Sequence, residues 1–208
     1  MARDSTASPV PRVVRRALLA VVMVLAACQQ APNSARTSTA TVDTSRIVAV
    51  VKSAIEADYV QSMLPPGMTP GSLSDADVRA LKSRITAAYE AYYTGPQLHD
   101  RISAMLEWAD RMAAHPGLRT VVAEMTSFEG NVTQLKPSSA TVEGTYAIHH
   151  VNESGSGTSL ARWGGLVRQT YVAQLDQVGE VWLVANLSQR QLSFTPDPSL
   201  DAQSSPSE

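Results

Sequence analysis

The stretch Tyr171-Val-Ala-Gln-Leu-Asp-Gln-Val-Gly-Glu-Val-Trp-Leu-Val-Ala-Asn-Leu187 alternates apolar and polar residues on both sides of a short turn. A period of two is typical of a β-strand, in which successive side chains lie on opposite faces. Because the turn at Gln177-Val178-Gly179 is short, we expect an antiparallel hairpin of two strands, Leu166–Asp176 and Glu180–Leu192. The alternation groups residues by face: Val167, Gln169, Tyr171, Ala173 and Leu175 in the first strand, and Val181, Leu183, Ala185 and Leu187 in the second.

Two more strands are predicted upstream of this hairpin, at Arg119–Glu129 and Ala140–Val151, with a polar loop over residues 130–139 between them. A loop rich in glycine and serine, residues 152–159, connects them to the hairpin. The second strand alternates in the same way, with Val142, Gly144, Tyr146, Ile148 and His150 on one face. Four strands in this order predict an antiparallel meander.

Before residue 118 the period is about 3.6, which predicts three helices. The first spans residues 46–61. The second begins after Ser74, which can form a capping box with Asp77, and it stops at Gly95-Pro96. The third ends at His115-Pro116-Gly117. Their apolar faces are Ile47, Val50, Val51, Ala54, Ile55 and Tyr59; Val78, Leu81, Ile85, Ala88, Tyr89 and Tyr92; and Leu98, Ile102, Met105, Ala109 and Met112.

Helices followed by a meander indicate an α+β fold, with three N-terminal helices and then a curved antiparallel sheet of about four strands. This order, together with the ending Tyr171-Val-Ala-Gln-Leu-Asp and Glu180-Val-Trp-Leu-Val-Ala-Asn186-Leu, resembles the nuclear transport factor 2-like, or cystatin-like, superfamily. A Trp-x-Val pattern is common in the last hairpin of such domains. The resemblance spans about residues 75–194 and implies a cone-like domain, in which the curved sheet and the helices enclose an interior.

Residues 1–27 have the composition of an export signal. Four arginines and one aspartate give them a net charge of +3, and an apolar run of 11 residues, Ala17–Ala27, follows. A membrane-spanning helix needs about 20 apolar residues, so this run is too short. Its end, Leu25-Ala26-Ala27-Cys28, resembles the lipobox of bacterial lipoproteins. The resemblance implies cleavage between Ala27 and Cys28 and lipidation of Cys28; the alternative is an ordinary secretory signal.

The rest of the chain divides into three parts by composition. Residues 28–45 are small and polar, which predicts a flexible tether with a root-mean-square reach of roughly 20–25 Å. Residues 46–194 form the single α+β domain, and residues 195–208 are predicted to be a disordered tail.

Charge and cysteine content exclude several functions. Beyond residue 27 the chain carries 13 basic and 18 acidic side chains without a block of lysine or arginine, which argues against nucleic-acid binding. A single cysteine, Cys28, excludes an internal disulfide and a second thiolate ligand for zinc. We therefore predict no cofactor and no metal site.

No catalytic motif is present either. Of the four histidines, His99, His115, His149 and His150, none has the spacing of a metal-binding helix, and the adjacent pair should point to opposite faces of its strand. His150 is a candidate acid or base, or else a partly solvated histidine near a strand end.

Two groups of side chains are candidate binding residues. Tyr89, Tyr92, Tyr146, His150 and Tyr171 would line a pocket inside the cone, although aromatics at helical spacing are also typical of a core. Trp163, predicted in the loop before the third strand, would contact a partner protein or cover the open edge of the sheet.

We therefore expect a non-catalytic envelope lipoprotein, held by its lipid anchor on the outer side of a bacterial membrane, that binds an envelope protein or serves as an accessory module. The first alternative is a protein that binds a small apolar ligand such as a lipid. The second is an isomerase- or dehydratase-like enzyme that uses His150 as a pocket acid or base. A buried pair of histidine and carboxylate would favour the enzyme, and an exposed apolar patch near Trp163 would favour the partner-binding module.

Overall fold

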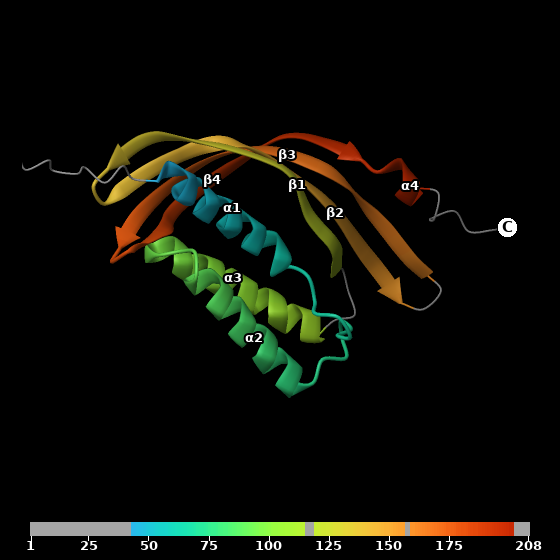
Figure 1. Cartoon of the computed structure of the whole chain (residues 1–208). Helices are drawn as coiled ribbons and strands as arrows, with labels where there is room; N and C mark the ends of the chain where they lie inside the picture. The colour runs from blue at the N-terminus through green and yellow to red at the C-terminus, as the bar shows by residue number, and fades with distance from the viewer. Residues whose placement is uncertain (1–42, 115–118, 157–158, 202–208) are drawn as a thin grey trace, which may run out of the picture. The chain divides into compact units, whose positions relative to one another are not determined.

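The computed structural model describes residues 43–114, 119–156 and 159–201 (Figure 1). Their elements follow one another as α1 (Thr44–Val60), α2 (Asp75–Glu90), α3 (Gly95–Ala114), β1 (Arg119–Lys136), β2 (Ser139–Ser156), β3 (Ser159–Val178), β4 (Val181–Pro196) and the short α4 (Pro198–Asp201). The strands form one antiparallel sheet in the order β1-β2-β3-β4. The predicted α+β class is thus confirmed, and the curved, open sheet is consistent with a cone-like domain of the nuclear transport factor 2-like kind.

The sequence signal for the start of α2 is confirmed by its cap. The Ser74 and Asp77 side chains each accept a hydrogen bond from the other's backbone N–H, at 3.2 and 3.0 Å, so the predicted capping box begins α2. At α1 the Asp43 carboxylate accepts from the backbone N–H of Ser45 at 3.0 Å. Because this cap starts the helix at Thr44, residues 44 and 45 belong to α1 and not to the predicted tether.

The strands are longer than the sequence pattern predicted. The predicted loop 152–159 is mostly strand, because Asn152, Glu153 and Ser154 pair with Trp163, Arg162 and Ala161. Trp163 therefore lies within β3, where we had predicted a loop. At the other end β4 continues to Pro196 and α4 follows, so residues 195–201, predicted as part of a disordered tail, are structured. Pairing with a neighbouring strand orders these polar segments although they bury little apolar surface.

In β4 the predicted faces are wrong after a β-bulge. Leu175 pairs with Val184 and Gln174 with Asn186, so Ala185 is an extra residue that moves the following side chains to the other face. Val184 and Leu187 are consequently the buried residues, whereas Val181 is exposed. The backbone N–H of Val184 also donates to the carbonyl of Tyr92 at 2.8 Å, and its carbonyl accepts from the N–H of Thr94 at 2.9 Å. These hydrogen bonds attach the α2–α3 connection to this edge of the sheet.

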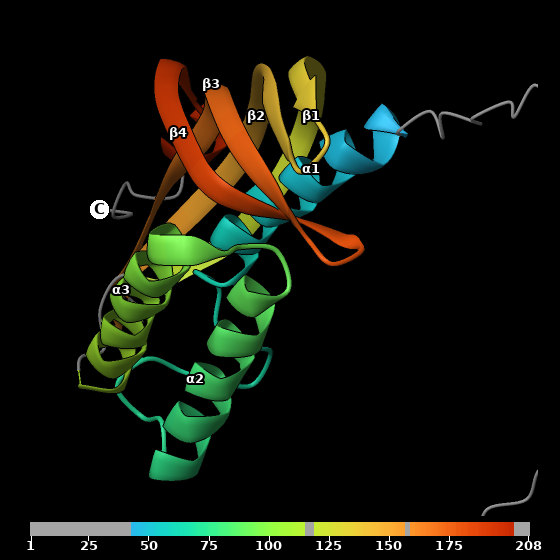
Figure 2. The same ribbon diagram turned by 90° about the vertical axis from the view of Figure 1, so that its left-hand side faces the viewer.

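Helices α1, α2 and α3 lie on one side of the sheet, which arches over them (Figures 1 and 2). Helix α1 packs against β1, α3 packs against β4, and α2 packs mainly on α3. Residues of α1, α2, α3, β2, β3 and β4 form the buried core, and β1 packs against it with the partly buried Met125, Phe128 and Val132. No helix in the described part of the chain is long and apolar enough to cross a membrane.

Candidate functional site

The tyrosines predicted to line a pocket are packed in the core. Tyr89, Tyr146 and Tyr171 are almost fully buried, and Tyr92 is half-buried. The rings of Tyr146 and Tyr171 have centroids 6.1 Å apart, whereas Tyr89 packs on Tyr93 at 5.7 Å. The structure therefore brings two of the predicted residues together, and these rings contact other aromatic side chains.

An ion pair crosses the interior between α1 and α3. Arg101 donates to Asp58 Oδ2 at 2.5 Å, the Tyr93 hydroxyl donates to the same oxygen at 3.0 Å, and the guanidinium lies 4.6 Å from the Tyr93 ring centroid. Burial raises the pKa of Asp58 more than the charge of Arg101 lowers it. The geometry is that of a fixed structural salt bridge, in which two buried polar atoms, Asp58 Oδ1 and Arg101 Nε, make no hydrogen bond to the described residues.

The sequence analysis missed this ion pair. Its one signal was the position of Asp58, a charged residue directly before Tyr59 at the end of the apolar face of α1. Its partner lies 43 residues away, so no local pattern connects them.

A second polar chain joins α1 to the sheet. Gln169 donates to the Tyr59 hydroxyl at 3.0 Å, and that hydroxyl lies 3.1 Å from the hydroxyl of Tyr146. Burial raises the pKa of both phenols above the usual 10.0. They remain neutral near pH 7 and act as hydrogen-bonding groups.

His150 is partly buried and faces Phe194, with ring centroids 6.0 Å apart. Burial, and then the neighbouring His149, lower the pKa of His150 below its usual 6.5. Within residues 43–114, 119–156 and 159–201, no carboxylate is hydrogen-bonded to His150. His149 has a different partner, Asp197, at 3.3 Å. No group of three or more potential metal-binding side chains occurs among the residues described.

Two exposed aromatic side chains, Trp163 and Phe194, lie on the same face of the sheet as His150. We call these three residues the aromatic patch. Trp163 and Phe194 are 42% and 45% exposed. Gly165 lies two residues from Trp163 on the same strand face, and a Cβ added to it would lie 3.0 Å from the Phe194 ring. The sequence had singled out two of the three members, but it placed Phe194 near the end of its domain without a role.

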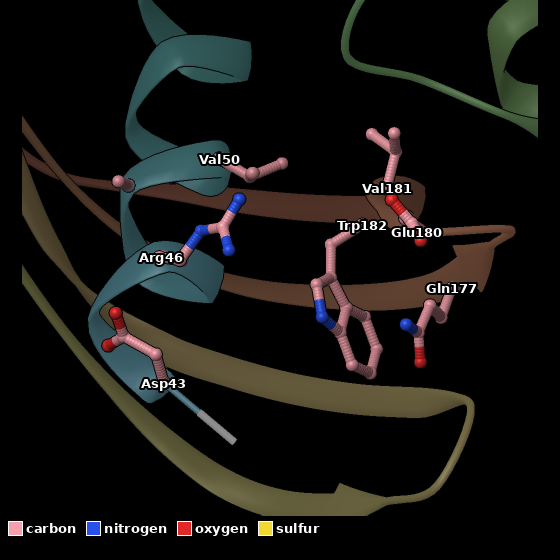
Figure 3. A pocket seen from close by; sticks show the side chains of 8 residues that line it. Asp43, Arg46, Val50, Gln177, Glu180, Val181 and Trp182 are labelled. Atoms are coloured by element: carbon pink, nitrogen blue, oxygen red, sulfur yellow. The ribbon is translucent and has the colours of Figure 1, made fainter. Parts of the chain in front are cut away.

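A groove of about 390 Å³ lies at the end of β3 that is far from Trp163, beside the start of α1 (Figure 3). Arg46 on α1 and Trp182 on β4 face each other across it. The full lining is Asp43, Arg46, Ala49, Val50, Gln177, Glu180, Val181 and Trp182. A second groove, of about 320 Å³, lies between the first turns of α1 and residues 130–132 of β1. The start of α1 is therefore flanked by a groove on each side.

Comparisons with known proteins find similarity at the level of structure. No protein-family model matches the chain, and no curated protein matches it in sequence. Among solved structures, the chain is similar to a hexachlorocyclohexane dehydrochlorinase (LinA) type 2, with 12% sequence identity and a TM-score of 0.36. The match covers 71% of this chain and 86% of the dehydrochlorinase. Ala27 and Cys28, the predicted cleavage and lipidation positions, lie outside the described residues.

Proposed function

We propose that the protein is an exported, lipid-anchored binding module, and that the aromatic patch of Trp163, Phe194 and His150 contacts a partner protein of the cell envelope. The anchor rests on Leu25-Ala26-Ala27-Cys28, the lipobox-like end of the leader. The observation that carries the partner contact is the exposure of two large aromatic side chains on one face of the sheet. Such residues are enriched at the energetic centres of protein interfaces.

The interior supports a binding role better than a catalytic one. Tyr146 and Tyr171 are occupied with each other and with neighbouring rings, and Asp58 is bound by Arg101. An enzyme that uses His150 as acid or base would need a hydrogen-bonding group that orients the imidazole. Among the described residues, the ring that faces the imidazole is Phe194, which has no hydrogen-bonding group. The isomerase or dehydratase alternative therefore gains no support beyond His150 itself.

Site-specific photo-crosslinking tests this proposal in the cell. A photoreactive phenylalanine analogue replaces Trp163 in one variant and Val172 in another. Both residues are 42% exposed on β3, and Val172 lies on the opposite face of the sheet from Tyr171, so it is a matched control. We expect the probe at position 163 to capture one envelope protein that the probe at position 172 does not capture.

The captured product should also depend on the rest of the patch. Adding Phe194→Ser to the position 163 probe should abolish the crosslink while the protein level stays unchanged. Equal crosslinking from positions 163 and 172, or only background from both, would contradict the proposed partner contact.

A further inference from the structure

We infer that the end of the domain next to the predicted tether rests on the lipid bilayer. This inference depends on the proposed lipid anchor at Cys28 and adds the surface that meets the membrane. The surface consists of the start of α1 at Asp43 and the two hairpin turns at residues 136–139 and 178–181 (Figure 1). We call this surface the tether end.

The three segments of the tether end form one continuous surface. The backbone N–H of Gln177 donates to the carbonyl of Ser138 at 2.9 Å, which joins the two turns. Asp43 and Arg46 line the same groove as Val181 and Trp182, which joins the start of α1 to the β3–β4 turn (Figure 3). Segments far apart in the sequence are thus held side by side.

The tether end carries exposed apolar side chains. Val178 and Val181 are 53% and 54% exposed, the highest values among the large exposed hydrophobic residues of the described chain, and Leu135 is also exposed at the β1–β2 turn. Trp182, the neighbour of Val181 in the chain, is partly packed on the core and lines the groove. Aliphatic side chains beside a tryptophan are the composition that favours the interface between lipid headgroups and acyl chains.

The position of the anchor selects the bilayer as the occupant. Cys28 is separated from Asp43 by residues 29–42, a small and polar segment whose composition predicts a reach of roughly 20 Å. Lipidation would therefore keep this end of the domain close to the membrane. The acidic side chains of Asp43 and Glu180 offset the basic ones of Arg46 and Lys136, so the contact should be apolar and independent of anionic lipid.

The test places a fluorophore on the lipidated full-length protein in vesicles of phosphatidylcholine and phosphatidylethanolamine. Because lipid occupies the single native cysteine, Val181→Cys provides one free thiol for an environment-sensitive dye, and Val172→Cys provides the matched control. We expect the dye at position 181 to shift its emission to the blue on reconstitution and to be quenched by brominated acyl chains. The dye at position 172 should keep its emission in water, and raising the salt concentration should change neither result.

Vesicle flotation separates the two ways in which the inference can fail. If the protein floats with the vesicles but the dye at position 181 behaves as the dye at position 172 does, the anchor is present and the docking is wrong. If the protein does not float, the proposed lipid anchor is wrong, and the docking that depends on it is wrong too. Val178→Ser combined with Val181→Ser gives a second readout in the unlabelled protein, where the blue shift of tryptophan emission on reconstitution should be lost.

Discussion

Tyr171 and Gly144 are direct partners across β3 and β2, and the tyrosine hydroxyl and the carbonyl of Glu129 border the space that a side chain at position 144 would fill. A Cβ on Gly144 would lie 2.8 Å from the Tyr171 hydroxyl oxygen and 1.9 Å from the carbonyl oxygen of Glu129. The hydroxyl donates to that same carbonyl at 3.1 Å, and the ring stacks on Phe128 with centroids 5.4 Å apart. The absence of a side chain at position 144 therefore lets three strands pack around one aromatic ring.

Gly144→Ala should lower the free energy of unfolding by about 1–3 kcal/mol, because the new methyl group overlaps backbone that cannot move without breaking strand pairs. Urea denaturation measures the change. Tyr171→Phe is the control: it removes only the hydroxyl and should cost about 1 kcal/mol. The double variant should remain as unstable as Gly144→Ala, since the carbonyl of Glu129 still clashes. A Gly144→Ala protein of wild-type stability would refute this explanation.

Breaking the ion pair of Asp58 and Arg101 should destabilise the fold strongly, whereas replacing both residues by apolar ones should destabilise it little. Either Asp58→Leu or Arg101→Met leaves one charge buried without its partner, and each should destabilise the fold by about 3 kcal/mol. The double variant should be closer to the wild type than either single variant, because two apolar side chains need no partner. Strictly additive losses in this double-mutant cycle would show that the two residues are not coupled.

Glu153 holds the far ends of three strands together. It is almost fully buried, and its two carboxylate oxygens accept hydrogen bonds from Arg119 at 2.7 Å and from Arg162 at 2.8 Å. Both arginines are its direct partners on the neighbouring strands. Burial raises the pKa of Glu153, but the two arginines more than offset it and hold the pKa below its usual 4.5.

A lowered pKa predicts a stabilisation that depends on pH. The contribution of Glu153 should be fully present above the unfolded-state pKa of about 4.5 and should be lost as the pH falls through the lower folded-state pKa. Glu153→Gln should therefore reduce the urea midpoint strongly at pH 7 and little near pH 3. Glu107→Gln, which removes an exposed glutamate 3.8 Å from Arg111, is the control and should change the midpoint little at either pH. An equal loss at both pH values would argue against the ionised carboxylate as the source.

Cys28→Ser should abolish lipidation, because the acyl chains of a lipoprotein are attached at the cysteine that follows the cleavage site. Metabolic labelling with radioactive palmitate checks this in the expressing cells: the variant should carry no label and should keep its leader. Ser34→Ala, a substitution a few residues further along, should be labelled and processed like the wild type. Label retained by Cys28→Ser would rule out lipidation at this position.

Local interactions allowed the sequence to determine much of the fold. The capping box of Ser74 and Asp77 and the turn at Gln177 to Gly179 each depend on residues within a few positions of one another. The predicted stop of the second helix at Gly95 was wrong, because α2 ends at Glu90 and Gly95 begins α3. The change of period from 3.6 to 2 after residue 118 gave the element order, and with it the α+β class. The adjacent histidines were expected to point to opposite faces, and they have different partners, Asp197 and Phe194, because alternation along a strand is also local.

Only the tertiary structure decided how the strands pair and which side chains meet. The extra residue Ala185 changes the buried face of β4 because the register is set by β3 and by the α2–α3 connection, not by β4 itself. Trp163 belongs to a strand because β2 supplies its partners. Asp58 meets Arg101, and Phe194 meets His150, across separations that no local pattern encodes, since such contacts form only when distant elements are packed on one another.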